Sequence, residues 1–189
     1  MSRGKIQKYL GMTLYYTVSG VSRINMLEFI DEILTEFKKM DTRNSGTKSS
    51  AEPENLFKVN EDCEKLIPEK SKRFHNLVDK TLYTTKRDRP ANCISVALLN
   101  IKVREPDTND CNKLDHLMKY LRKTRDLPLI LVAGITGILN WWIDASSTVH
   151  HNMRGHTGTG LSMVRGFPVV TSTKNNLDTQ ALQKQRLSE

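Results

Sequence analysis

The chain has 189 residues, of which 38% are hydrophobic and 26% charged, and it carries a formal net charge of +8. This length can bury a core in one or two small domains, and the positive charge favours an anionic partner such as nucleic acid, although many basic proteins bind none. The three cysteines, Cys63, Cys93 and Cys111, lie far apart and outside any CxxC pair, which excludes a disulfide framework and a cysteine-based zinc site and is typical of a reducing compartment.

The N-terminal third of the chain predicts a strand or hairpin, then a helix and a linker. Residues 6–19 mix β-branched, aromatic and apolar side chains, and Ser19 and Gly20 mark a turn. Asn25 can cap a helix that follows, because Glu28 lies three residues on and apolar residues repeat at helical spacing through Met26, Leu27, Ile30, Leu34 and Phe37. Residues 41–72 lose this periodicity and gather Ser, Gly, Pro and charge, which indicates a linker or an extended surface segment.

The central part of the chain predicts three amphipathic helices. The first buries an apolar face formed by Phe74, Leu77, Val78, Leu82 and Tyr83, and it stops before Pro90. The second covers residues 93–103, and the third places Leu114, Leu117, Met118 and Leu121 on one side. Lys and Arg side chains are concentrated in this region, between residues 70 and 125. They fit either a solvated helix face or a surface that contacts an anion.

After Leu127 the pattern changes to short strands, written "LILVA", "ILNWWIDA", "GTGLSMVRG" and "PVVTST". Short connections predict that neighbouring strands pair antiparallel, so the whole chain is predicted to be α+β. The apolar run over residues 127–143 is interrupted by Pro and Gly and is shorter than the ~20 residues that span a bilayer. The N-terminal segment also lacks the apolar core of a signal peptide. We therefore predict no membrane association and a cytoplasmic protein that is not secreted.

Two groups of polar residues near the C-terminal strands are candidates for chemistry. Asp144 follows "WWI" and fits either the polar end of a strand or a ligand of Mg²⁺, although one carboxylate does not make a two-metal site. His150 and His151 are adjacent and would point in opposite directions from a strand, and His156 has no cysteine nearby. These histidines are interpreted as surface-loop residues, not as a zinc site.

Four blocks, in this order, resemble the C-terminal part of the Pol polyprotein of copia-type long-terminal-repeat retrotransposons. They read "KYLGMTLYYTVSG", "RFHNLVDKTLYTTKRDRPANCISVALL", "HLMKYLRKTRDLPL" and "WWIDASSTVHHNMRGHTGTGLSM", and the similarity extends from about Gly4 to Thr179. The resemblance implies four segments: the end of a reverse transcriptase palm and thumb (1–40), a linker (41–72), a basic helical thumb or connection (73–126) and a truncated ribonuclease H domain (127–189). The implied architecture is a helical thumb- and connection-like region followed by an incomplete ribonuclease H-like antiparallel sheet.

The resemblance also implies roles for individual residues. "YLGMTL", with Tyr9 and Gly11, is similar to the hairpin that helps to hold the primer, and Asp144 is similar to the first Mg²⁺-binding carboxylate of ribonuclease H. The basic helices would follow the backbone of an RNA–DNA hybrid or of another nucleic acid, because phosphate contacts give affinity without sequence preference. The candidate contacts are Lys86, Arg87, Arg89, Lys119, Arg122, Lys123 and Arg125.

The sequence also departs from the family pattern. It has no YxDD polymerase motif, and Lys184 stands where the family has the second metal-binding Glu, while the nearby Asp178 aligns with a family Asn. We therefore predict a fragment that has no polymerase or ribonuclease H activity on its own and binds Mg²⁺ unproductively.

The remainder of a Pol polyprotein is a second expected partner, and the virus-like particle and the nucleus are alternative locations. A non-specific nucleic-acid-binding remnant that uses helices 73–125 is the alternative function. Free strand edges after Leu127 predict self-association of that segment.

Overall fold

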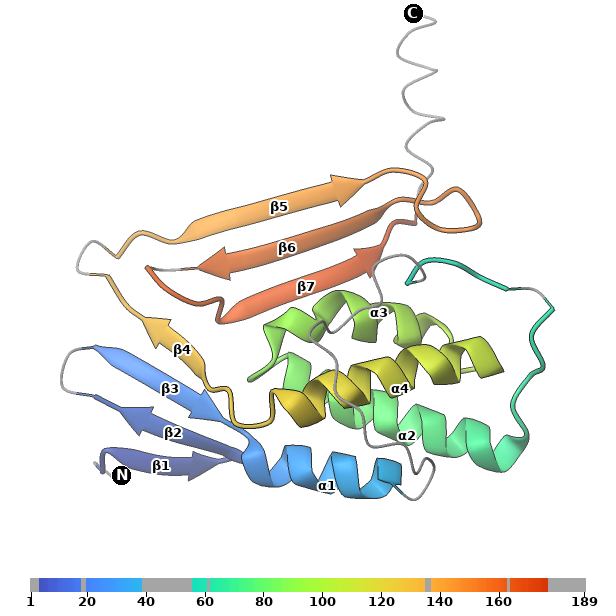
Figure 1. The fold of residues 1–189 in the computed structure, drawn as a ribbon. Helices are drawn as coiled ribbons and strands as arrows, with labels where there is room; N and C mark the ends of the chain where they lie inside the picture. The colour runs from blue at the N-terminus through green and yellow to red at the C-terminus, as the bar shows by residue number, and fades with distance from the viewer. Residues whose placement is uncertain are drawn as a thin grey trace, which may run out of the picture.

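The structure is a computed structural model that describes residues 4–17, 20–38, 56–60, 62–134, 137–162 and 164–176. Its described part contains four α-helices and two antiparallel sheets, which confirms the predicted α+β class. Figure 1 shows the helices grouped together, with one sheet extending from them on the N-terminal side and the other lying across them. None of the helices in these described segments is long and apolar enough to cross a membrane.

The first sheet has the order β1-β2-β3-β4 and joins the start of the chain to a strand that follows the helices. Its strands are β1 (Ile6–Tyr9), β2 (Met12–Tyr16), β3 (Val21–Asn25) and β4 (Leu129–Val132). The predicted hairpin is confirmed. The prediction that the strand at residues 129–132 pairs with the next strand along the chain is wrong, because β4 pairs antiparallel with β3, from Val21 opposite Val132 to Ile24 opposite Leu129.

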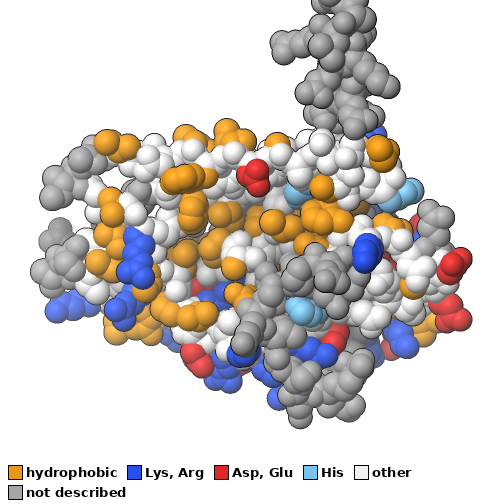
Figure 2. Space-filling model, turned by 45° about the horizontal axis from the view of Figure 1, so that its top comes forward, with side chains coloured by type: hydrophobic (Ala, Val, Ile, Leu, Met, Phe, Trp, Pro, Cys, Tyr) orange, Lys and Arg blue, Asp and Glu red, His pale blue; other side chains and the backbone are white. Residues whose placement is uncertain are grey.

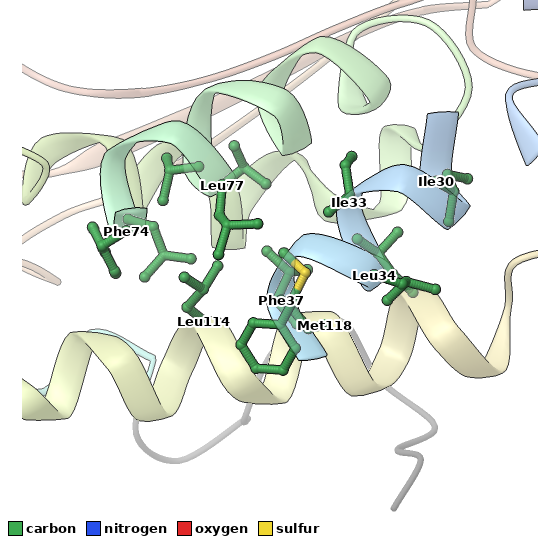
Figure 3. Close-up of a cluster of buried hydrophobic side chains, with 13 residues drawn as sticks. Ile30, Ile33, Leu34, Phe37, Phe74, Leu77, Leu114 and Met118 are labelled. Carbon is green, nitrogen blue, oxygen red and sulfur yellow. The ribbon is translucent and has the colours of Figure 1, made fainter. Parts of the chain in front are cut away.

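The helices form the core of the molecule, as their apolar periodicity predicted. They are α1 (Leu27–Lys38), α2 (Pro68–Thr85), α3 (Cys93–Ile101) and α4 (Thr108–Lys123), and a short 3₁₀ turn, η1 (Pro90–Asn92), separates α2 from α3. Figure 3 shows side chains from α1, α2 and α4 packed against one another. The buried cluster consists of Ile30, Ile33, Leu34, Phe37, Phe74, Leu77, Val78, Val96, Leu99, Leu114, Leu117, Met118 and Leu121.

Side chains cap the starts of two helices, and a third helix begins earlier than the sequence predicted. Asp107 caps α4 and forms a reciprocal capping box with Asp110, which satisfies amide groups that the first helical turn leaves without partners. The Asn25 side chain accepts a hydrogen bond from the Leu27 amide at 2.6 Å, so it acts at the start of α1 as predicted. Helix α2 begins at Pro68, inside the segment 41–72 that was expected to be a linker, because proline is well accommodated in a first helical turn. The four-segment division itself remains a prediction.

The second sheet has the order β5-β6-β7, and its strands are β5 (Asn140–Ser146), β6 (His156–Ser162) and β7 (Val169–Lys174). All neighbouring pairs are antiparallel, as predicted. In Figure 1, β7 lies nearest the helices and β5 forms the outer edge. Every residue of β5 is exposed, including Ile143 with 71% of its surface accessible, and Figure 2 shows hydrophobic side chains over this part of the molecule. Self-association through this edge remains a prediction.

Candidate nucleic-acid interface

The turn between β1 and β2 presents two of the residues that the sequence assigned to the interface. Tyr9 pairs with Met12, so the turn consists of Leu10 and Gly11 alone. Both have positive φ, 50° and 76°, which is the backbone required by a tight two-residue hairpin and is unfavourable for leucine. The Tyr9 side chain is 62% exposed. The turn therefore projects an accessible aromatic ring from a constrained backbone.

Helix α2 holds this turn through Tyr83. The Tyr83 hydroxyl donates a hydrogen bond of 2.8 Å to the carbonyl of Leu10, and its ring lies 5.3 Å from the ring of Phe29. Arg87, one turn later, places its guanidinium carbon 3.7 Å from the centre of the Tyr83 ring, which is a cation–π contact. The structure thus brings the hairpin turn and Arg87 together, although they are more than 70 residues apart in the chain.

Sequence reasoning assigned Tyr83 only to the buried face of its helix and missed its connecting role. The available signal was its spacing of four residues from Arg87, which places the two side chains on the same face of a helix. The hydrogen bond to Leu10 had no sequence signal, because it depends on how α2 packs against the hairpin. We name the group formed by Tyr9, Gly11, Tyr83 and Arg87 the hairpin–helix surface.

The remaining basic candidates on α2 and just after it differ in exposure. Lys86 is exposed, and its ammonium group donates to the carbonyl of Val170 in β7 at 3.2 Å. Arg89 is buried, and its guanidinium donates to the carbonyl oxygens of Arg125, at 2.7 Å, and of Leu127. It also pairs with the buried carboxylate of Asp88 at 3.4 Å. These internal contacts occupy Arg89, so we leave it out of the interface proposed below.

The candidates on α4 and after its end are also only partly accessible. Lys119 is 15% exposed in its side chain and forms an ion pair with Asp115 at 2.5 Å. Arg122 is half-buried, whereas Lys123 is exposed. Arg125 is exposed and pairs with Asp31 of α1 at 3.3 Å. Among these four side chains, Lys123 and Arg125 are the most available to a nucleic acid.

Asp144 lies inside β5 and not at its end, so the strand-end interpretation is wrong: two further residues extend the strand to Ser146. Its neighbours across the sheet are Gly158 in β6 and, beyond that, Ser172 in β7, so neither supplies a second carboxylate. No group of three or more His, Cys, Asp or Glu side chains able to hold a metal occurs among the described residues. Lys184 and Asp178 lie outside them. The residues around Asp144 therefore do not fit a two-metal Mg²⁺ site.

His150 and His151 lie in the loop between β5 and β6, as the sequence predicted, and His151 is exposed, but the prediction is wrong for His156. His156 lies within β6 and is buried, its Nε2 is 2.6 Å from the Ser172 hydroxyl, and its Nδ1 is 3.0 Å from Nε2 of His150. The ring of Phe57 packs edge-on against both imidazoles. Burial lowers the pKa of His156. Burial, together with the charges of Lys174 and His156, lowers the pKa of His150 to about 4.

These pKa shifts predict that acid destabilises the protein between pH 6.5 and 4. In this range the unfolded chain takes up protons on both imidazoles, whereas folded His150 stays neutral until the pH approaches 4 and the lowered pKa of His156 acts in the same direction, so stability falls as pH falls. The melting temperature should drop less steeply in His150→Gln than in the wild type, and His151→Gln serves as the matched control. Equal pH dependence of all three proteins, measured by circular dichroism, would contradict this assignment.

Comparison with known proteins gives one informative similarity. The chain is 25% identical over 176 residues to the putative transposon Ty5-1 protein of Saccharomyces cerevisiae. The match covers 90% of this chain and 54% of that protein, so the chain spans about half the length of this relative. No protein-family model and no solved structure matches the chain.

Proposed function

We propose that the chain is part of a retrotransposon Pol polyprotein of the copia type and binds a nucleic-acid duplex on the hairpin–helix surface. The similarity to a transposon protein along most of the chain supports the retrotransposon origin. The four sequence blocks, which resemble the end of a reverse transcriptase and the start of a ribonuclease H domain, support the assignment to copia-type Pol. An RNA–DNA hybrid is the proposed ligand.

The contact between the Leu10–Gly11 turn and Tyr83 is the observation that carries the proposed binding role. It holds the turn next to the exposed Tyr9 against Tyr83, and the guanidinium of Arg87 lies over the Tyr83 ring. An aromatic ring can stack on a sugar or a base, and a guanidinium can bind phosphate oxygens through two parallel hydrogen bonds. The exposed cations Lys86, Lys123 and Arg125 would add phosphate contacts that do not depend on sequence.

The proposal includes no catalysis by this chain alone. Asp144 is the one acid of the expected ribonuclease H set that the described residues provide, and its neighbours across the sheet are Gly158 and Ser172. A single exposed carboxylate cannot position two Mg²⁺ ions for phosphodiester hydrolysis. Mg²⁺-dependent cleavage of an RNA–DNA hybrid that Asp144→Asn abolishes would contradict this part of the proposal.

Charge reversal tests the proposed interface. Arg87→Glu should weaken binding of an RNA–DNA hybrid roughly tenfold or more at low salt, because it removes a phosphate contact and adds repulsion. Lys38→Glu is the matched control: it makes the same change in net charge at an exposed position on α1, away from the hairpin–helix surface. Fluorescence anisotropy with a labelled hybrid measures both affinities. An equal loss in the two variants would show that only net charge matters and would overturn the assignment to Arg87.

A further inference from the structure

A cavity of about 390 Å³ lies between the helices and the second sheet, apart from the hairpin–helix surface. It is lined by the segment before α2, the end of α3, the start of α4, the β5–β6 connection and the end of β7. Part of its wall is apolar, contributed by Leu56, Phe57, Val59, Leu98 and Ile101. Cavities of about 300–1,000 Å³ with apolar walls and a few polar groups are typical of small-molecule sites.

The polar side of this cavity is strongly basic. Five cationic side chains line it, namely Lys65, Lys102, Arg104, Lys113 and Lys174, against the two acids Glu105 and Asp110. Asp110 is already engaged in the capping box of α4. Within the described residues, none of the five cations forms an ion pair.

These cations are close enough to act on one another. Lys102 directly follows α3, Lys113 lies in α4 and Lys174 ends β7, and each of the three is half-buried. Burial lowers the pKa of Lys174, and the charges of Arg154 and Lys102 lower it further. Burial also lowers the pKa of Lys113, and Lys102 adds to this effect against the opposing charges of Asp110 and Asp107. An anion among these side chains would replace mutual repulsion with attraction.

We propose that this cavity binds a nucleotide, with its phosphates against Lys102, Lys113 and Lys174 and its base against the apolar wall beside Phe57. The basic side supplies charge-assisted hydrogen bonds to phosphate oxygens, and the apolar side buries the flat face of a base. This site is separate from the hairpin–helix surface and does not depend on the function proposed above. The nucleotide is either a free molecule or the terminal nucleotide of a strand, since both present the same chemistry.

Isothermal titration calorimetry with ADP tests the site in the full chain. Saturable binding is expected, weakened roughly tenfold or more in Lys102→Ala/Lys174→Ala, because hydrogen bonds to charged groups are stronger than neutral ones. Lys38→Ala, which removes an exposed lysine outside the cavity, should bind ADP as the wild type does. No binding of ADP at millimolar concentration, or an equal loss in the two variants, would overturn the proposal.

Two further binding measurements test which parts of the ligand the cavity contacts and whether the ligand is a free nucleotide or the end of a strand. ADP should bind more tightly than inorganic pyrophosphate, and equal affinities would overturn the role of the apolar wall. Displacement of ADP by a 5′-phosphorylated oligonucleotide would identify a strand end as the source, and its absence would identify a free nucleotide. Should the double variant fail to fold, the ring protons of His150, which lines the cavity, provide a second measurement by NMR in the wild-type protein. They should shift with ADP, and unchanged signals at saturating ADP would overturn the site.

Discussion

Replacing Arg89 by Ala is expected to lower the free energy of unfolding by about 3–5 kcal/mol, because it leaves the buried Asp88 carboxylate without its counter-charge. The side chains of Asp88 and Arg89 are 0% and 6% exposed. Burial raises the pKa of Asp88 and lowers that of Arg89, while each charge opposes the shift of the other. Urea unfolding followed by circular dichroism measures the loss.

The pair also holds three parts of the chain together. Asp88 accepts hydrogen bonds from the amides of Met26 at 3.2 Å and Leu129 at 3.3 Å, while Arg89 binds carbonyl oxygens of the segment between α4 and β4. Asp88→Asn/Arg89→Ala should therefore recover part of the loss, because it removes the unpaired charge. If Arg89→Ala instead weakened nucleic-acid binding and left stability unchanged, Arg89 would belong to the interface.

Replacing Leu117 by Ala is expected to lower the free energy of unfolding by about 2–5 kcal/mol, because the smaller side chain leaves a cavity in a close-packed core. Leu117 is fully buried in the cluster shared by α1, α2, α3 and α4. Ile94→Ala on α3 is the matched control, since Ile94 is 47% exposed and should lose much less stability. Equal effects in urea unfolding would show that the helices do not share this core in solution.

The helices could be predicted from the sequence because their periodicity records which side of each helix is buried. Leu114, Leu117, Met118 and Leu121 were all expected on one face of the third helix, and all four are buried in α4. The hairpin was predictable for a similar reason, since its turn joins two short runs of residues with strand propensity. These features depend on residues that are close together in the chain.

The features that sequence reasoning missed depend on contacts between distant segments. The sequence predicts a strand at residues 129–132 but not its partner. The strand pairs with β3 because the chain returns to the first sheet after α4, and because the Asp88 carboxylate binds the amides of both Met26 and Leu129. The basic character of Arg89 was visible, whereas its burial was not. The position of His156 between His150 and Ser172 likewise results from the pairing of β6 with β7.

The affinity of the wild-type chain for an RNA–DNA hybrid, measured against salt concentration, tests the central claim most directly. Binding through the half-buried Arg87 and the exposed Lys86, Lys123 and Arg125 releases counterions, so the logarithm of the association constant should fall linearly with the logarithm of salt. We expect a slope of roughly −2 to −4, at somewhat less than one unit for each phosphate contacted. No binding at low salt, or a slope near zero, would contradict nucleic-acid binding by this chain.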